Sequence, residues 1–237
     1  MTRSIESGLM AAGLVATGMV AGGFLLGQQI ASIRTADRSV QVRGSAELPV
    51  IADLATWALN LSASGNDLTQ VQQQLAGDLN KIRTFLGKQG VKPDEIDVGS
   101  LSVSDAQANQ YGGNTNGARY VVTGGVTVRT GNLDGIKKAK DSLDELLGQG
   151  VVLTNSYGPN YAFTKLNDAK LELVSRATNE AYKAAEQFAK DSGARIGGIK
   201  RASQGSVQVL GRDGFMGESE QVNKVLRVVT TVDYDLY

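Results

Sequence analysis

The sequence predicts an α+β fold made of duplicated strand-helix-strand-strand units, with antiparallel sheets covered by helices and a transmembrane helix at the N-terminus. Three observations predict it: a long uncharged N-terminal run, two amphipathic segments that each end at a glycine, and apolar-polar alternation around both segments. We divide the chain into an N-terminal membrane anchor, residues 1–37, and a folded part, residues 38–237. The folded part contains two pseudo-repeats, about 50–130 and about 150–237.

The first residues predict the membrane segment. No charged residue occurs between Glu6 and Arg34. As a helix this run would be about 40 Å long, which exceeds the roughly 30 Å hydrocarbon core of a bilayer. We interpret about residues 8–30 as an uncleaved single-pass helix. The alternatives are a cleaved signal peptide, with a cleavage site at residues 21–23, and a buried soluble helix, which the glycine content disfavours.

Four glycines give this segment a candidate packing face. Gly18 and Gly22, like Gly23 and Gly27, have the small-xxx-small spacing that lets membrane helices approach closely. The alternative is the general enrichment of glycine in membrane helices. The flanking charges do not determine the orientation of the segment.

A short strand is expected at 39–44, and the first pseudo-repeat then begins with a long strand at 50–64, after Pro49. The apolar face of the second strand comprises Ile51, Ala55, Trp57, Leu59, Leu61 and Ala63. A helix is expected from the Asn66-Asp67 cap to Gly90, because apolar residues recur at helical spacing between them. That stripe comprises Leu68, Val71, Leu75, Leu79, Ile82 and Leu86.

The pattern then returns to strands. Residues 95–105 form an expected strand with an irregularity at Gly99-Ser100, and a loop at 106–117 leads to a strand at 119–130. A shorter helix is expected over 132–148, capped by Asn132.

The second pseudo-repeat has the same order of elements. We expect a strand at 151–163, a long helix at 167–192, a strand at 194–210, a loop at 211–221 and a final strand at 222–237. The inner face of the helix is expected to comprise Val174, Ala177, Ala181, Ala184 or Ala185, and Phe188. Because most of these side chains are small, the helix should pack close to its partner.

Composition restricts the chemistry that the chain can perform. It has no His and no Cys, which excludes a histidine proton shuttle, a thiolate nucleophile, disulfides and the usual zinc ligands. The 24 basic and 24 acidic residues give zero net charge, which argues against nucleic-acid binding. Carboxylate, lysine, tyrosine and serine chemistry remains open on composition alone. Because no motif brings such residues into a recognisable site, we expect no catalytic residues, metal or cofactor.

Several segments of the folded part resemble the SIMPL-domain family of bacterial cell-envelope proteins, and its branch with a short N-terminal membrane segment. The resemblance rests on the segments VQVRGSAELPVIADLATWALNLSASGNDL (40–68), GPNYAFTKLNDAKLELVSRATNEAYKAAEQFAKDSGARIGGIKRASQG (158–205) and VLRVVTTVDYDL (225–236). Ala52 departs from the pattern, because many members have proline there. The resemblance implies an α+β domain with a repeated unit, a periplasmic or envelope location, large homo-oligomers in some members, and a link to oxidative stress. It implies no catalytic residues.

Individual residues offer few candidate sites. Asp53 is the one charged residue within an apolar strand, so it is either a buried carboxylate with a perturbed pKa or one that caps a turn. Tyr111 in the first loop, and Phe215 and Met216 in the second, are candidate oligomer contacts. Alternatively, these side chains fold back onto their own domain and make no contact with another copy.

These observations lead to one hypothesis. The protein is expected to be a single-pass inner-membrane protein with a periplasmic domain, forming a ring or cage of identical copies, structural rather than catalytic. Its expected partners are itself and the lipid bilayer; any small-molecule ligand is unknown. The alternative functions are an envelope stress-response or ligand- or partner-binding module, and, last, an enzyme that uses carboxylates.

Overall fold

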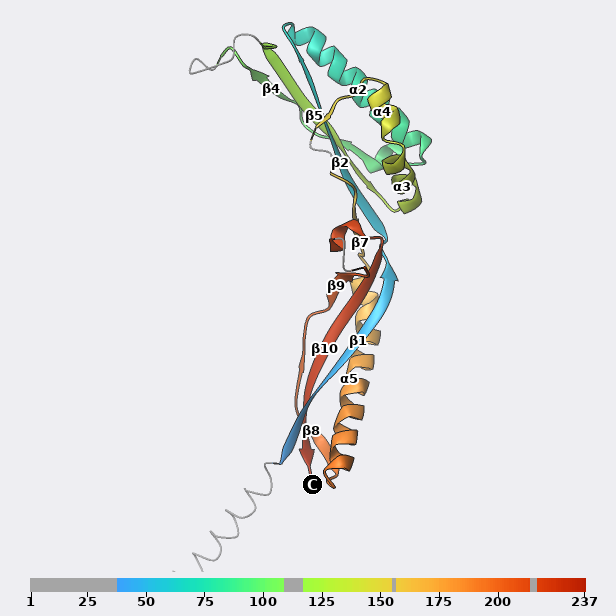
Figure 1. The fold of residues 1–237 in the computed structure, drawn as a ribbon, viewed down its shortest axis with the longest axis vertical. Helices are drawn as coiled ribbons and strands as arrows, with labels where there is room; N and C mark the ends of the chain where they lie inside the picture. The colour runs from blue at the N-terminus through green and yellow to red at the C-terminus, as the bar shows by residue number, and fades with distance from the viewer. Residues whose placement is uncertain (1–37, 109–116, 155–156, 214–216) are drawn as a thin grey trace, which may run out of the picture. The chain divides into compact units, whose positions relative to one another are not determined.

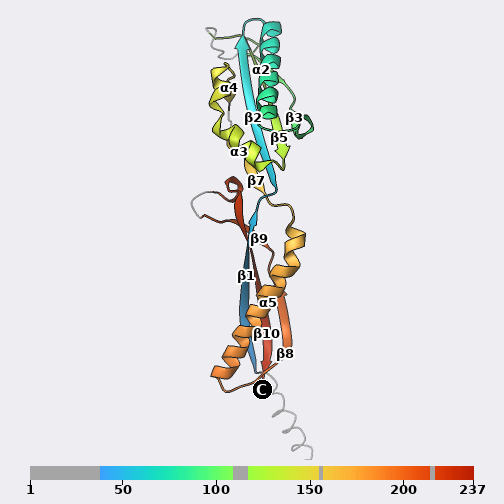
Figure 2. The same ribbon diagram turned by 90° about the vertical axis from the view of Figure 1, so that its right-hand side faces the viewer.

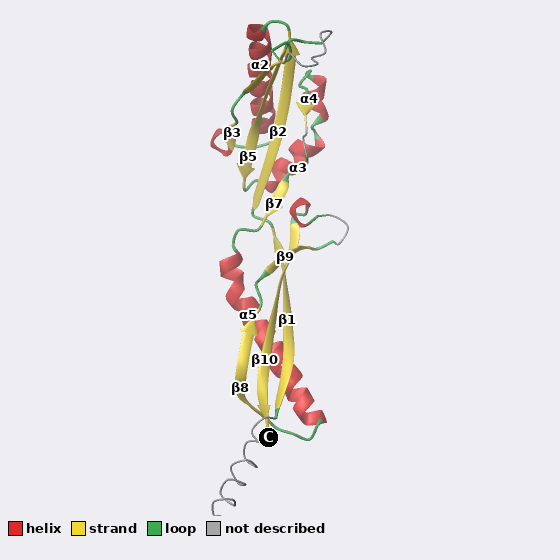
Figure 3. Ribbon diagram, turned by 90° about the vertical axis from the view of Figure 1, so that its left-hand side faces the viewer, coloured by secondary structure: helices red, strands yellow, loops and turns green. Residues whose placement is uncertain are grey.

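The computed structural model describes residues 38–108, 117–154, 157–213 and 217–237 (Figure 1). This part of the chain contains two antiparallel sheets with helices, which confirms the predicted α+β class (Figure 3). Among these residues no helix is long and apolar enough to cross a membrane. The predicted membrane segment, with Gly18, Gly22, Gly23 and Gly27, lies outside them.

Two compact units make up the fold. Unit 1 comprises the residues up to Ala46, Val174–Gly205 and Val229–Tyr237. Unit 2 comprises Glu47–Leu173 and Ser206–Val228. Three long elements contribute residues to both units: β1 (Ser39–Ile51), α5 (Leu166–Asp191) and β10 (Asn223–Leu236).

Unit 2 is built on a sheet with the order β3-β5-β2-β6, in which β4 also pairs with β5 and β7 with β2. Its strands are β2 (Leu54–Gly65), β3 (Ile96–Val98), β4 (Ser102–Asp105), β5 (Tyr120–Thr130), β6 (Leu153–Thr154) and β7 (Asn160–Ala162). Helix α2 (Leu68–Lys88) lies along one face, as predicted, with Asp67 as its N-cap and Gly90 at a φ of 84° after its end.

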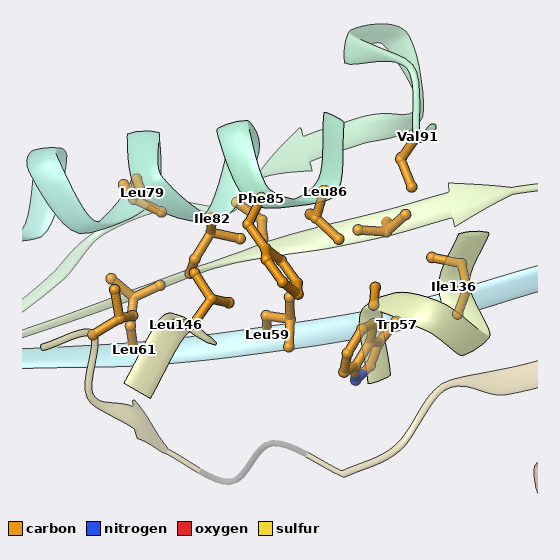
Figure 4. Packing of buried hydrophobic residues seen from close by; sticks show 14 of the residues in the cluster. Trp57, Leu59, Leu61, Leu79, Ile82, Phe85, Leu86, Val91, Ile136 and Leu146 are labelled. Carbon is orange, nitrogen blue, oxygen red and sulfur yellow. The ribbon is translucent and has the colours of Figure 1, made fainter. Parts of the chain in front are cut away.

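The core of unit 2 lies between α2 and this sheet. Ile82 and Phe85 of α2 point toward Leu59 and Leu61 of β2, and Trp57 lies beside Ile136 (Figure 4). The other face of β2 is exposed or half-buried and carries mainly small polar residues, among them Thr56, Asn60 and Ser62, as expected for an antiparallel sheet with one covered face. The predicted helix over 132–148 is interrupted, and forms α3 (Leu133–Asp141) and α4 (Asp144–Gly148).

The second sheet has the order β1-β10-β8, with β9 (Gln208–Gly211) also paired to β10; β8 spans Ile196–Gln204. In unit 1, α5 crosses the strands obliquely (Figure 2). Its buried side chains recur every four residues: Ala177, Ala181, Ala185 and Ala189. A row with that spacing is inclined by about 26° to the helix axis, which explains the crossing.

Glycine and alanine permit this close packing. A Cβ on Gly44 of β1 would overlap the Ala177 carbonyl oxygen and the Ala181 nitrogen of α5. The expected close approach of the long helix is therefore observed, but Phe188 is 54% exposed and does not belong to the inner face. The inner row uses Ala185 and Ala189 instead.

The break between the first two strands differs from the prediction. Strand β1 continues through Pro49 to Ile51, and the chain bends at residues 52–53. Proline is tolerated there because β1 is an edge strand, where one side needs no N–H donor. Ile51 is consequently 64% exposed rather than part of the core.

The two sheets share one strand arrangement. The order β2-β5-β3 in one sheet matches β1-β10-β8 in the other, with α2 and α5 in equivalent chain positions. The sequence pattern predicts that a strand at 151–163 begins the second pseudo-repeat. In the structure β1 occupies the corresponding position beside β10, whereas β6 and β7, which lie within 151–163, pair with β2 of the other sheet.

Candidate functional site

Asp53 lies in the bend between β1 and β2 and is half-buried. Its Oδ1 accepts a hydrogen bond from the Thr164 backbone N–H at 2.8 Å, and its Oδ2 accepts one from Thr164 Oγ1 at 3.0 Å. The Asp53 N–H donates to the Ala162 carbonyl at 2.9 Å. This geometry is that of a carboxylate that fastens a bend to the segment after β7.

The predicted contact residues Tyr111, Phe215 and Met216 lie outside the described residues. The base of the second loop is described. Gln221 Oε1 accepts from the Asp213 N–H at 2.9 Å, and Gln221 Nε2 donates to the Asp213 carbonyl at 2.5 Å. This reciprocal pair closes the loop at its base.

Lys224 supports the same loop from inside. Its side chain is fully buried, and its Nζ donates to the Glu218 carbonyl at 2.6 Å and pairs with Glu218 Oε1 at 2.5 Å. A buried ammonium group requires such partners. The sequence does not single out Lys224, although it lies at a spacing of two from the buried Leu226 and Val228 and so shares their face of β10.

A second clamp holds the base of the first loop. Arg119 Nη2 lies 3.1 Å from Asp105 Oδ2, and the guanidinium lies 4.8 Å from the centre of the Tyr120 ring. The hydrogen bond from Arg119 lowers the pKa of the Asp105 carboxyl, and the same pair raises the pKa of Arg119. Arg119 is exposed and Asp105 is half-buried, and the pair ties the two ends of the loop together.

A pocket of about 500 Å³ lies beside the C-terminal half of α2, and we call it the α2 pocket. It is lined by Arg83, Gly87, Val91, Pro93 and Ile96. Its volume lies within the roughly 300–1,000 Å³ of small-molecule sites. Arg83 is the single charged side chain in this lining.

The far wall of the α2 pocket is held in place by hydrogen bonds. Glu95 accepts from the Lys92 N–H at 2.9 Å and from Thr130 Oγ1 at 2.7 Å. Thr130 Oγ1 in turn accepts from the Asn132 N–H at 3.0 Å, and Asn132 Nδ2 donates to the Gly90 carbonyl at 3.1 Å. The turn that carries Val91, Pro93 and Ile96 is therefore preorganised.

An apolar strip continues from this pocket along the edge of the sheet. Ile96 and Val98 pair with the buried Val128 and Val126, and so face the same side as α2. Farther along the edge, Val98, Leu101 and Val103 are 40–49% exposed. Isolated exposed apolar residues are common, but a contiguous row indicates a contact surface.

The opposite face of the sheet carries a polar hollow of about 430 Å³. Its polar side chains come from Asn60, Ser100, Thr123, Thr127 and Thr154, and glycines 124 and 125 form part of its lining. The hollow lies at a β-bulge. Val98 pairs with Val126 and Ser102 pairs with Thr123, so the segment between these pairs has one residue more on the β3–β4 side than on β5. The irregularity expected at Gly99-Ser100 is thus observed.

Strand β8 is the most exposed strand of the fold. It pairs with β10 on one side, and it has no strand on its other side within the described ranges. Seven of its nine residues are exposed, including Ile199 at 57%. Lys200 and Arg201 occupy its centre.

Metal chemistry has no candidate in the part of the chain that the structure describes: no group of three or more carboxylates gathers there. The polar groups of the α2 pocket and the polar hollow are suited to binding by hydrogen bonds and charge. Neither lining contains a carboxylate that could serve as a general acid or base.

Fold and sequence together identify the class of protein: an α+β chain whose two helix-covered antiparallel sheets share one strand arrangement. The SIMPL family model, described as a protein of unknown function (DUF541), matches residues 40–229, so the chain belongs to the SIMPL family. No curated protein shows significant sequence similarity to the chain.

Three solved structures are similar over much of the chain. They are a hydrolase, an uncharacterized conserved protein and a second hydrolase, all from Listeria innocua, with identities of 12%, 11% and 13% and TM-scores of 0.23, 0.22 and 0.21. Each alignment covers 77% of this chain and 90% of the other. The description as a hydrolase applies to those proteins.

Proposed function

We propose that this protein is a single-pass inner-membrane protein whose periplasmic domain assembles with identical copies into a ring or cage, with a structural rather than a catalytic function. The uncharged N-terminal run supports the anchor. The resemblance to envelope proteins supports the location.

The exposed β8 edge is the observation that carries the proposal of assembly. Edge strands offer unpaired N–H and C=O groups to another chain, and proteins usually protect such edges. In unit 1 the sheet ends in two different edges, β1 and β8. Addition of the β8 edge of one copy to the β1 edge of the next would be a head-to-tail contact, which gives a ring when the rotation closes.

Light scattering and low-resolution imaging of the full-length protein in mild detergent test this proposal. We expect a large particle of uniform size, and a monomer would refute it. Ile199→Lys on β8 should reduce the particle size, because it places a charge on the proposed contact. Leu147→Lys, at a similarly exposed position on helix α4 and away from both strand edges, is the matched control and should leave the size unchanged.

The second candidate function is an envelope stress-response module that binds a ligand or a partner. The preorganised α2 pocket favours it, because structural assembly does not require such a pocket. Affinity purification from solubilised membranes separates the two functions. A stoichiometric partner other than the protein itself would favour the second candidate, and recovery of the protein alone would favour the first.

A further inference from the structure

The charge on the α2 pocket is uncompensated. No residue in the described ranges forms a hydrogen bond or an ion pair with the Arg83 side chain, although arginine readily pairs with carboxylates. Glu95 lies in the turn opposite, but its two carboxylate oxygens accept from the Lys92 N–H and Thr130 Oγ1. The guanidinium therefore remains available to an anion.

The rest of the pocket suits a hydrocarbon. Val91, Pro93 and Ile96 supply apolar surface, and Gly87 leaves space beside the helix, because a Cβ there would meet no atom within 4 Å. The strip of Ile96, Val98, Leu101 and Val103 extends this surface beyond the pocket. A flexible chain longer than the pocket could lie along it.

We propose that the α2 pocket binds a free aliphatic carboxylate, a single hydrocarbon chain with one carboxylate head. The carboxylate pairs with the Arg83 guanidinium. The chain packs against Val91, Pro93 and Ile96 and continues along the edge strand toward Leu101. This site does not depend on assembly, because every residue in it belongs to unit 2 of one chain.

Photolabelling of the full-length protein in mild detergent tests this proposal, with a dodecanoate that carries a diazirine at its methyl end as the probe. Mass spectrometry of the digested protein locates the label. We expect it within residues 91–103, and we expect unlabelled dodecanoate to compete. Arg83→Gln should reduce labelling about tenfold, because it removes a charge-assisted hydrogen bond.

Two glycines of α2 provide a matched pair of variants. Gly87→Leu should fill the pocket and abolish labelling. Gly77→Leu, in the same helix and also without any atom within 4 Å of its Cβ position, lines a different hollow and should leave labelling unchanged. Both replace a helical glycine with a better helix former, so both variants should fold, which circular dichroism checks.

Three results would overturn the proposal. The first is equal loss of labelling in Gly77→Leu and Gly87→Leu. The second is equal competition by dodecylamine or dodecanol, which would show that the head group is not recognised. The third is labelling that appears only when phospholipid is added, which would assign the site to a membrane lipid.

Discussion

Gly44→Ala tests the close packing of β1 against α5. The new Cβ would overlap the Ala177 carbonyl oxygen and the Ala181 nitrogen, which are backbone atoms within a helix and cannot rotate away. The clash can be relieved only if β1 and α5 move apart, which loosens the cluster of Val40, Ala181, Val232 and others. Overpacking in a core costs about 1–3 kcal/mol. Because two backbone atoms are involved, we expect about 3 kcal/mol.

Urea unfolding followed by two signals measures this loss. Trp57, the one tryptophan of the sequence, lies in the core of unit 2, so its fluorescence reports on that unit. Far-UV circular dichroism reports on both units. Gly198→Ala on β8 is the control, because its Cβ would meet no atom within 4 Å. If Gly44→Ala and Gly198→Ala unfold within about 0.5 kcal/mol of each other, the inferred contact of β1 with α5 is wrong.

Three further predictions concern the bend, Tyr161 and the location of the domain. Asp53→Ala should destabilise the fold by about 1–3 kcal/mol, because it removes both hydrogen bonds from Thr164; Asp53→Asn, which keeps one acceptor, should cost less in the same urea experiment. Burial raises the pKa of Tyr161 above 10.0, with a smaller effect of Asp141. The folded state therefore holds that proton more tightly, so the contribution of Tyr161 to stability should be constant below pH 10 and be lost above it, and Tyr161→Phe should lessen the fall at alkaline pH. Since the chain has no cysteine, one introduced at the exposed Leu171 should react with a membrane-impermeant maleimide in cells with a permeabilised outer membrane if the domain is periplasmic; labelling only after cell lysis would place it in the cytoplasm.

The helices could be predicted from the sequence because their signals are local. The α2 stripe, the Asp67 cap and the glycine after the helix lie within one continuous segment, and each is found where expected. The same holds for the Asn132 cap of α3. Such patterns need no knowledge of the partner surface.

Features that depend on distant partners could not be predicted in the same way. The strand break at residues 52–53 is fixed by Ala162 and Thr164, which lie more than 100 positions later. The place of β1 in its sheet depends on β10, at the other end of the chain. Periodicity alone could not distinguish β1 from residues 151–163 as the first strand of the second copy.

The candidate pocket was missed for a related reason. Arg83 and Gly87 lie on one flank of a helix, while Val91, Pro93 and Ile96 follow its end, and only the fold brings them together. In the sequence, Arg83 has the pattern of a solvated helix residue. Only the structure shows that the Glu95 carboxylate accepts hydrogen bonds from the Lys92 N–H and Thr130 Oγ1 rather than pairing with Arg83.

The two compact units obtain their stability differently. On α2 the buried apolar residues are large, such as Leu75, Ile82 and Phe85, and each contributes about 1.5–3 kcal/mol on burial. On α5 within unit 1 the buried residues are alanines, which bury little area and depend on close contact with Gly44. Unit 1 therefore gains less from apolar burial and also carries β8, whose outer edge pairs with no strand within the described ranges. A neighbouring copy that adds a strand to that edge would bury further surface where the chain itself buries least, and this is why we place the proposed contact on unit 1.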